Sequence, residues 1–417
     1  MLDMSKLDKA VESNRRFFVD TLCKLISIPT VVPPGEHYSE LTETLEKLLI
    51  ELGFDVKVYE VPRNIVEKCY PEYADYPRYI VVARIGSQRP TIHINGHYDV
   101  VPPGSGWSRD PFRPTVEDGK VYGRGATDMK GGIATAITFA KSLVESHQTI
   151  PFTLELSFTP DEEIGGLTGV KYMLESRIVN PDYAIVAEPS GIDNVWYGNK
   201  GSVWLLVEVF GKQAHGSTPW LGVNAFEKMV ELVYKMIHEL KPRIESKISR
   251  YEYEDPRGAR ATINIGGEIR GGAKINIVPG YVAFTIDRRV IPEESAEEAL
   301  NEILSFIEEA KKAIPDLNVN VKVLGISDAV VTDPEQPIVK AFVESIREVV
   351  GRARRTVCIG GLDTRYFQKM GIPAVTYGPG EPSVAHLADE YIPIDHYEVV
   401  AKVYGRAINR LLRSHGA

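Results

Sequence analysis

The chain has 417 residues, of which 43% are hydrophobic and 25% charged, and its formal net charge at pH 7 is −9. This composition is typical of a globular enzyme, and the length predicts two domains of roughly 100–200 residues each. The acidic balance argues against a nucleic-acid partner, and no uncharged run approaches the about 20 residues that a membrane span needs. The first ten residues lack an apolar segment, and the three cysteines are scattered, so we expect no secretory signal and a cytoplasmic location.

The first half of the chain alternates between helical and strand patterns. Apolar residues at helical spacing predict helices over 6–26, 40–52, 133–144 and 167–174. Apolar runs predict strands over 55–61, 79–84, 91–95, 152–158 and 183–187. This alternation is typical of a layered α/β domain.

The pattern changes after Glu188. Strands are predicted over 203–210, 261–266, 281–287 and 317–324, with helices over 224–240 and 296–314. The resulting order is β-α-β-β-α-β, as in a ferredoxin-like unit. The segment from Asp333, which ends in an amphipathic helix over 399–412, is too short to form a domain alone. We therefore expect residues 198–326 to be an inserted domain, and residues 1–197 and 327–417 to form one catalytic domain.

Acidic and histidine residues gather where predicted strands end. His97 and Asp99 follow one strand, Glu162 and Glu163 follow another, and Glu188 ends a third. The carboxyl ends of strands are where α/β proteins place their chemistry. Because side chains alternate along an extended chain, His97 and Asp99 would point the same way, so that the carboxylate could orient the imidazole.

Two closely spaced metal ions need several carboxylates and imidazoles, one carboxylate shared between the ions, and a free base. Asp128, in the Gly-rich segment Gly123-Arg-Gly-Ala-Thr-Asp128-Met-Lys-Gly-Gly, is the natural bridge, and Glu162 is left over as the base. The candidate metal ligands are His97, Asp128, Glu163, Glu188 and His386.

Each of these features also has a simpler explanation. A His-x-Asp pair occurs by chance in many proteins, adjacent glutamates often begin a solvated helix, and an aspartate in a Gly-rich loop can be a turn residue. His93 and His396 compete with His386 as the last ligand. The concurrence of acids and imidazoles at strand ends and Gly-rich loops of one predicted domain favours the metal site.

Six ordered motifs carry a resemblance that covers nearly the whole chain. They are Gly96-His97-Tyr-Asp99, Gly123-Arg-Gly-Ala-Thr-Asp128, Asp161-Glu162-Glu163-Ile-Gly, Ala187-Glu188-Pro-Ser, Gly211-Lys-Gln-Ala-His215-Gly-Ser and Ala385-His386-Leu-Ala-Asp-Glu. With these motifs the chain resembles the zinc amidohydrolase and metallopeptidase family of acetylornithine deacetylase, succinyl-diaminopimelate desuccinylase, aminoacylase and glutamate carboxypeptidase. The resemblance implies a zinc-peptidase-like catalytic domain with an inserted ferredoxin-like lid and dimerisation domain.

Carried over position by position, the resemblance implies two Zn²⁺ ions, with Co²⁺ as an alternative metal. His97 and Glu188 would hold one ion, Glu163 and His386 the other, and Asp128 would bridge them. Glu162 would be the general base, with Asp99 behind the ligands.

In the inserted domain, His215 matches a histidine that stabilises the oxyanion in the partner subunit of a homodimer. Asn276 and Arg289 match positions that bind a substrate carboxylate, although Arg288 could be the inward-facing arginine instead. Gly361-Leu-Asp363-Thr-Arg365 resembles a Gly-Gly-Thr-Asp-x-Arg loop, with Leu362 in place of the usual threonine. The strand over 203–210 is expected to offer an edge for pairing across the dimer axis, because it is rich in apolar and β-branched residues.

The residues and the resemblance together predict a di-zinc hydrolase that cleaves an amide bond of an N-acyl amino acid. A metallo-carboxypeptidase or dipeptidase of the same family is the alternative with the same chemistry. The alternative from another class is a non-catalytic binding protein, which loss of the base or of a ligand would mark. Glu162 and all five candidate ligands are present, so the enzyme is favoured.

Overall fold

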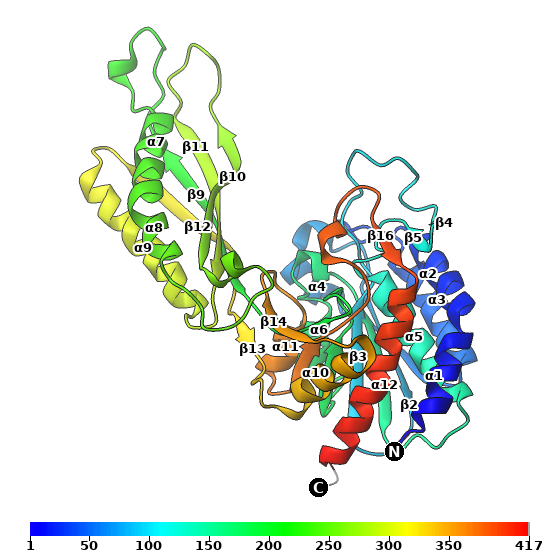
Figure 1. Cartoon of the computed structure of the whole chain (residues 1–417). Helices are drawn as coiled ribbons and strands as arrows, with labels where there is room; N and C mark the ends of the chain where they lie inside the picture. Colours follow the sequence, from blue (N-terminus) through cyan, green and yellow to red (C-terminus); the bar gives the residue numbers. More distant parts are fainter. Residues whose placement is uncertain (416–417) are drawn as a thin grey trace. The chain divides into compact units, whose positions relative to one another are not determined.

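The computed structural model describes residues 1–415, and they form two compact units (Figure 1). The first unit comprises Met1–Gly198, Thr332–Thr356 and the described residues from Leu362 onward. The second comprises Asn199–Val331 and Val357–Gly361. The second unit thus runs a few residues past position 326 and takes in a short segment that the sequence did not predict to belong to it.

A mixed β-sheet is the centre of the first unit. Its strands within this unit are β1 (Asp55–Glu60), β2 (Tyr79–Ile85), β3 (Thr91–His97), β6 (Thr153–Thr159), β7 (Tyr183–Val186), β8 (Asn194–Asn199), β14 (Arg354–Cys358) and β15 (Ala374–Thr376). They are arranged in the order β1-β2-β6-β3-β7-β15-β8, and β14 also pairs with β8. β3 runs parallel to β6 on one side and to β7 on the other. A small separate sheet has the order β16 (Tyr391–Pro393), β5 (Lys120–Tyr122), β4 (Thr115–Glu117).

Helices cover the large sheet. The helices of this unit are α1 (Met4–Ser13), α2 (Arg15–Ile26), α3 (Tyr38–Glu51), α4 (Arg63–Cys69), α5 (Lys130–Glu145), α6 (Val170–Glu175), α10 (Pro337–Val350), α11 (Thr364–Lys369) and α12 (Asp395–His415). α5 packs on β3 and contacts α1, α2 and α12. A second apolar cluster joins β2 and β7 to α4, α6 and α11, so layers of helix enclose the sheet as the α/β prediction requires.

The helix predicted over residues 6–26 is interrupted, which corrects that expectation. The chain leaves α1 at Asn14, whose side-chain amide donates to the carbonyl oxygen of Ala10 and to Ser142 and Glu145 of α5. An asparagine readily satisfies backbone groups at a helix end, and here tertiary partners stabilise the break. Periodicity alone does not report such partners.

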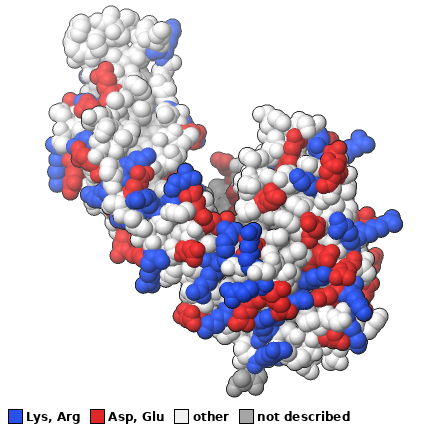
Figure 2. Space-filling view, viewed as in Figure 1, with Lys and Arg blue, Asp and Glu red and all other residues white. Residues whose placement is uncertain are grey.

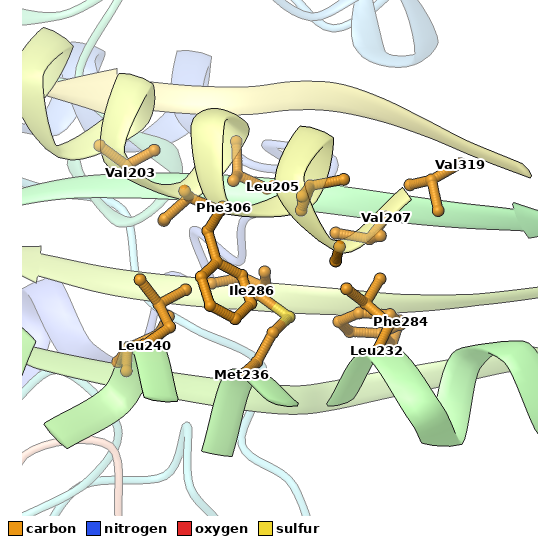
Figure 3. Packing of buried hydrophobic residues seen from close by; sticks show 14 of the residues in the cluster. Val203, Leu205, Val207, Leu232, Met236, Leu240, Phe284, Ile286, Phe306 and Val319 are labelled. Atoms are coloured by element: carbon orange, nitrogen blue, oxygen red, sulfur yellow. The ribbon is translucent and has the colours of Figure 1, made fainter. Parts of the chain in front are cut away.

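The second unit has the predicted β-α-β-β-α-β order. Its elements are β9 (Gly201–Phe210), α7 (Ala225–Lys235), η4 (Met236–Leu240), α8 (Lys241–Glu245), β10 (Thr262–Gly271), β11 (Tyr281–Val290), α9 (Ala296–Ala313) and β12 (Asn318–Ser327). The four strands form an antiparallel sheet, and the helices lie on one face of it (Figure 1). Side chains alternate along β9, so that Val203, Leu205 and Val207 point into the core that they share with Met236 and Phe306 (Figure 3).

The strand order overturns the expectation that residues 203–210 offer a free edge. The order is β10-β11-β9-β12, and β9 is hydrogen-bonded to β11 and to β12 along almost its whole length. The apolar and β-branched composition of β9 therefore reflects a central position in the sheet. The edges of this sheet are β10 and β12.

Among the described residues, no helix is both long and apolar enough to cross a membrane. On the face drawn in Figure 2, lysine and arginine side chains are interspersed with aspartate and glutamate.

Candidate metal centre

Three neighbouring parallel strands of the first unit bring the predicted residues to one edge of the sheet. His97 is the last residue of β3, Glu162 and Glu163 lie in the turn η2 (Glu162–Ile164) after β6, and Glu188 follows β7. Because β6, β3 and β7 are parallel neighbours, their carboxyl ends meet. The buried apolar runs that predicted these strands thus also determine where the polar groups that follow them are placed.

Loops supply the two other candidate ligands. Asp128 lies just before α5, and His386 follows the short helix η6 (Pro382–Val384). The start of α5 fits closely against the chain that carries Glu188, because a Cβ on Gly132 would lie 2.1 Å from the carbonyl oxygen of Ala187. The absence of a side chain at Gly132 therefore lets the Asp128 loop approach the end of β7.

The five side chains form two groups that share Asp128. His97, Asp128 and Glu188 offer ligand atoms within 4.8 Å of one another, and so do Asp128, Glu163 and His386. His97 Nε2 lies 3.2 Å from Asp128 Oδ1 and 3.2 Å from Glu188 Oε1. His386 Nε2 lies 3.2 Å from Asp128 Oδ2 and 2.9 Å from Glu163 Oε1. The two oxygens of one carboxylate therefore face two different imidazoles, which is the arrangement that a bridging ligand requires.

Asp99 acts on this centre mainly through the backbone of the Glu162–Glu163 turn. Its Oδ1 and Oδ2 accept hydrogen bonds from the backbone N–H groups of Glu162 (3.2 Å) and Glu163 (3.0 Å). His97 Nδ1 lies 3.0 Å from the carbonyl oxygen of Asp99 and 3.6 Å from Oδ1. The nearer acceptor for the imidazole is thus the main chain, whereas the sequence had suggested the carboxylate.

The pKa values of the candidate ligands are shifted from their usual values by burial and by one another. Burial and the neighbouring Asp128 raise the pKa of Glu163 to about 8, and the same two causes raise the pKa of Glu188. Hydrogen bonds to Asp128 and Glu163 raise the pKa of His386 to about 10. Burial lowers the pKa of His97, but Glu188, Asp128 and Asp99 outweigh it and raise that pKa overall. The carboxylates thus depend on protonated imidazoles for positive charge, and a divalent cation between them would supply that charge directly.

Glu162 stands beside the two ligand groups. Burial is the main cause that raises the pKa of its carboxyl group, and His97 and Arg365 partly offset that effect. A carboxylate whose proton affinity is raised in this way is a better proton acceptor near neutral pH. The position and environment of Glu162 fit the role of a general base.

The two competing histidines lie elsewhere in the fold. His93 is fully buried between Glu155 (2.7 Å) and Ser157 (2.8 Å), which engage both of its ring nitrogens. The backbone N–H of Gly380 donates to His396 Nδ1 over 3.3 Å. Neither histidine belongs to the two groups above, so the geometry favours His386 as the last ligand.

The remaining candidates belong to the second unit. His215 and Asn276 lie on adjoining loops, where the backbone N–H of Gly216 donates to the carbonyl oxygen of Asn276 over 2.8 Å. Arg289 is partly exposed and pairs with Asp287, whereas Arg288 is fully buried and pairs with Glu294. Of the two arginines, Arg289 is therefore the one that a substrate could reach.

Sequence reasoning did not assign a role to two buried acids of this region. Glu390 accepts hydrogen bonds from the loop that carries Asp128. Asp161, the residue before Glu162 in the sequence, forms an ion pair of 2.8 Å with the buried Arg78. Both acids lie within motifs already recognised in the sequence. The sequence feature that could have identified each of them is a charged residue inside a recognised motif, to which no chemical role had been assigned.

Comparisons with known proteins show several chains that are similar to this one. An uncharacterized metallohydrolase of Methanocaldococcus jannaschii is 30% identical over 407 residues, covering 91% of this chain and 96% of that protein. A probable succinyl-diaminopimelate desuccinylase of Staphylococcus epidermidis is 27% identical over 406 residues (92% and 96%), and an acetylornithine deacetylase of Myxococcus xanthus is 30% identical over 323 residues (78% and 80%). Among solved structures, a dipeptidase of Saccharomyces cerevisiae superposes with a TM-score of 0.80 at 18% identity, covering 98% of each chain, and so shares the fold.

The sequence profile of Peptidase family M20/M25/M40 matches residues 93–410, a span that contains both ligand groups and the whole second unit. The resemblance stated from the motifs is thereby confirmed, as are the α/β fold class and the assignment as an enzyme. The chain is a hydrolase that belongs to Peptidase family M20/M25/M40.

Proposed function

We propose that this protein is a di-zinc amidohydrolase that cleaves the amide bond of an N-acyl amino acid and releases the free amino acid. The observation that carries the proposal is the shared Asp128 carboxylate, whose two oxygens face His97 and His386 separately. Relatives named acetylornithine deacetylase and succinyl-diaminopimelate desuccinylase support an N-acyl amino acid as the substrate class.

The donor atoms suit the proposed metal. Imidazole nitrogen and carboxylate oxygen are the ligands that Zn²⁺ takes in catalytic sites, and Co²⁺ accepts the same set. In this proposal His97 and Glu188 hold one ion, Glu163 and His386 hold the other, and Asp128 bridges them. When bound, the ions would polarise the amide carbonyl and lower the pKa of a water molecule.

Glu162 would move the protons of the reaction. Its carboxylate takes a proton from the attacking water and then delivers it to the nitrogen of the leaving amino acid, so one residue serves as base and then as acid. The Asp99 carboxylate holds the backbone of this turn, which keeps Glu162 at a constant position relative to the ligands.

The second unit would contribute to substrate binding in a homodimer. His215 would stabilise the developing oxyanion in the partner's site, and Asn276 and Arg289 would bind the substrate carboxylate, for which an arginine offers two parallel donors.

Exposed apolar side chains also form a row on α7, where they lie four residues apart. They are Phe226, Val230 and Tyr234, with exposed fractions of 52%, 47% and 64%. An exposed apolar row of this kind on a helix is suited to packing against a second copy.

A hydrolysis screen tests the proposed substrate class. The metal-loaded protein should release an amino acid from N-acetylornithine, N-succinyl-diaminopimelate or another N-acyl amino acid, and a chelator should abolish the activity. Free amine formation measured with a fluorogenic reagent gives the rates. Preferential cleavage of dipeptides or of a peptide carboxyl terminus would instead establish a dipeptidase or carboxypeptidase. Metal binding without hydrolysis of any of these compounds would favour a binding protein.

The Glu162→Gln variant tests the base. Glutamine is nearly isosteric but cannot accept the proton of the water, so kcat should fall by about 10²–10⁴-fold. Metal content measured by atomic emission, together with the thermal unfolding profile, should remain those of the wild type. A metal-loaded variant with most of the wild-type rate would show that another group is the base.

Metal binding should release protons near pH 7. Without metal, Glu163 (pKa about 8) and His386 (pKa about 10) retain their protons at that pH, and both must lose them to act as ligands. Titrating the metal-free protein with Zn²⁺ in weakly buffered solution should therefore acidify it. His386→Ala should bind less zinc and release fewer protons, whereas the control His396→Ala should match the wild type. The opposite pattern would move the last ligand to His396.

Subunit mixing tests the proposed homodimer. His215→Ala and Glu162→Gln subunits should each be inactive alone, but a mixed dimer would have one site with both groups intact. Random exchange makes half of the dimers mixed with one competent site each, so about a quarter of the wild-type activity should return. A fully active monomer in sedimentation, or no recovery after mixing, would contradict the proposed role of His215.

A further inference from the structure

We propose that the buried ion pair between Arg124 and Glu390 is a positioning device that holds the Asp128 loop and the His386 loop together. Both metal positions would then depend on one pair of residues that would themselves touch neither the ions nor the substrate. This inference rests on the metal-binding role proposed above. Its evidence is the set of hydrogen bonds that the two side chains make.

Glu390 organises the loop that presents Asp128. Its Oε1 accepts the backbone N–H groups of Thr127 (2.8 Å) and Asp128 (3.0 Å). Its Oε2 accepts the backbone N–H of Gly125 (3.1 Å) and the guanidinium of Arg124 (2.6 Å). One carboxylate thus receives four donors from residues 124–128, which fixes the backbone direction from which the Asp128 side chain leaves.

Arg124 connects the same carboxylate to the other loop. Its Nη1 donates to Glu390, while its Nη2 donates to the carbonyl oxygens of His386 (3.2 Å) and Pro103 (3.2 Å). The guanidinium also lies over the ring of Trp107, 5.2 Å from the centroid. A planar fork can reach these acceptors at once, whereas the single ammonium group of a lysine cannot.

The His386 loop needs such an anchor. His386 has φ of +64°, a left-handed conformation that is unfavourable for a residue with a Cβ, and about half of its side chain is exposed. The half-exposed side chain of His386 therefore contributes little packing that could hold this loop in place. The hydrogen bond from Arg124 to the His386 carbonyl oxygen holds the backbone in the conformation that directs Nε2 toward Asp128 and Glu163.

Stability alone does not account for this ion pair. Arg124 and Glu390 each have an exposed fraction of 1%. A buried ion pair contributes little compared with apolar side chains of the same volume, because both charges must leave water. A role in setting geometry explains why charged groups occupy these positions.

The two partners should have different effects when changed. Glu390→Gln replaces an acceptor oxygen by an NH₂ group that faces N–H donors. It should therefore loosen the backbone at Asp128 and lower the metal affinity of both positions. Arg124→Lys retains a charge for Glu390 but loses the fork, so it should mainly weaken the position that includes His386. Residues that orient metal ligands in this indirect way are typically worth about 10–100-fold in metal affinity.

Cobalt titration of the metal-free full-length protein tests the inference, with visible absorption reporting coordination and equilibrium dialysis reporting stoichiometry. The wild type should bind two Co²⁺ ions, and Glu390→Gln should weaken both binding steps by about 10–100-fold. In a His386→Ala background, Arg124→Lys should not weaken the remaining ion further, whereas Glu390→Gln should. Circular dichroism of each metal-free variant confirms that it is folded.

Glu155→Gln is the matched control, because Glu155 is a buried carboxylate of the same unit that pairs with Arg84 and does not belong to either ligand group. It should leave both cobalt affinities unchanged. Unchanged affinities in folded Glu390→Gln and Arg124→Lys, or an equal loss in Glu155→Gln, would overturn the inference. A wild-type protein that binds no cobalt would overturn the proposed function, and this inference with it.

Discussion

The concentration of buried carboxyl groups at the carboxyl edge of the sheet is the constraint that the neighbouring loops and turns must satisfy. Asp128, Glu163 and Glu188 lie close together, and burial penalises their charged forms. Two imidazoles, His97 and His386, lie against these carboxyl groups in the described structure. Two divalent cations at the same place would offset the cost of burying the carboxylates.

Such a cluster requires a rigid frame, and the turn after β6 shows how the fold supplies one. Asp99 holds its backbone N–H groups from one side. The hydroxyl group of Tyr70 donates to the carbonyl oxygen of Ile164 (3.1 Å), and Tyr366 and Arg365 donate to that of Gly165 (2.6 and 2.9 Å). Side chains from several other segments thus hold the backbone of the turn, so Glu162 and Glu163 are positioned by tertiary contacts.

Much of the fold followed from local pattern. The strands β3 and β6 were predicted over 91–95 and 152–158, and the β-α-β-β-α-β order of the second unit was predicted too, because side-chain periodicity is a property of consecutive residues. The prediction of a free edge over residues 203–210 was wrong, since an apolar β-branched run is expected both at an edge used for pairing and at the centre of a sheet. The break at Asn14 was missed because its partners Ser142 and Glu145 lie far along the chain, in α5.

The sequence by itself determined which acids and histidines follow strands, and it led to the hypothesis that one aspartate is a bridge and one glutamate a base. Only the tertiary structure decided which of them meet. It separated His386 from His93 and His396, and it joined Glu390 to the backbone of residues 125–128. The physical reason is that residue type and spacing report what a segment can donate or accept, whereas the distance between segments far apart in the chain is set by the packing of the whole unit.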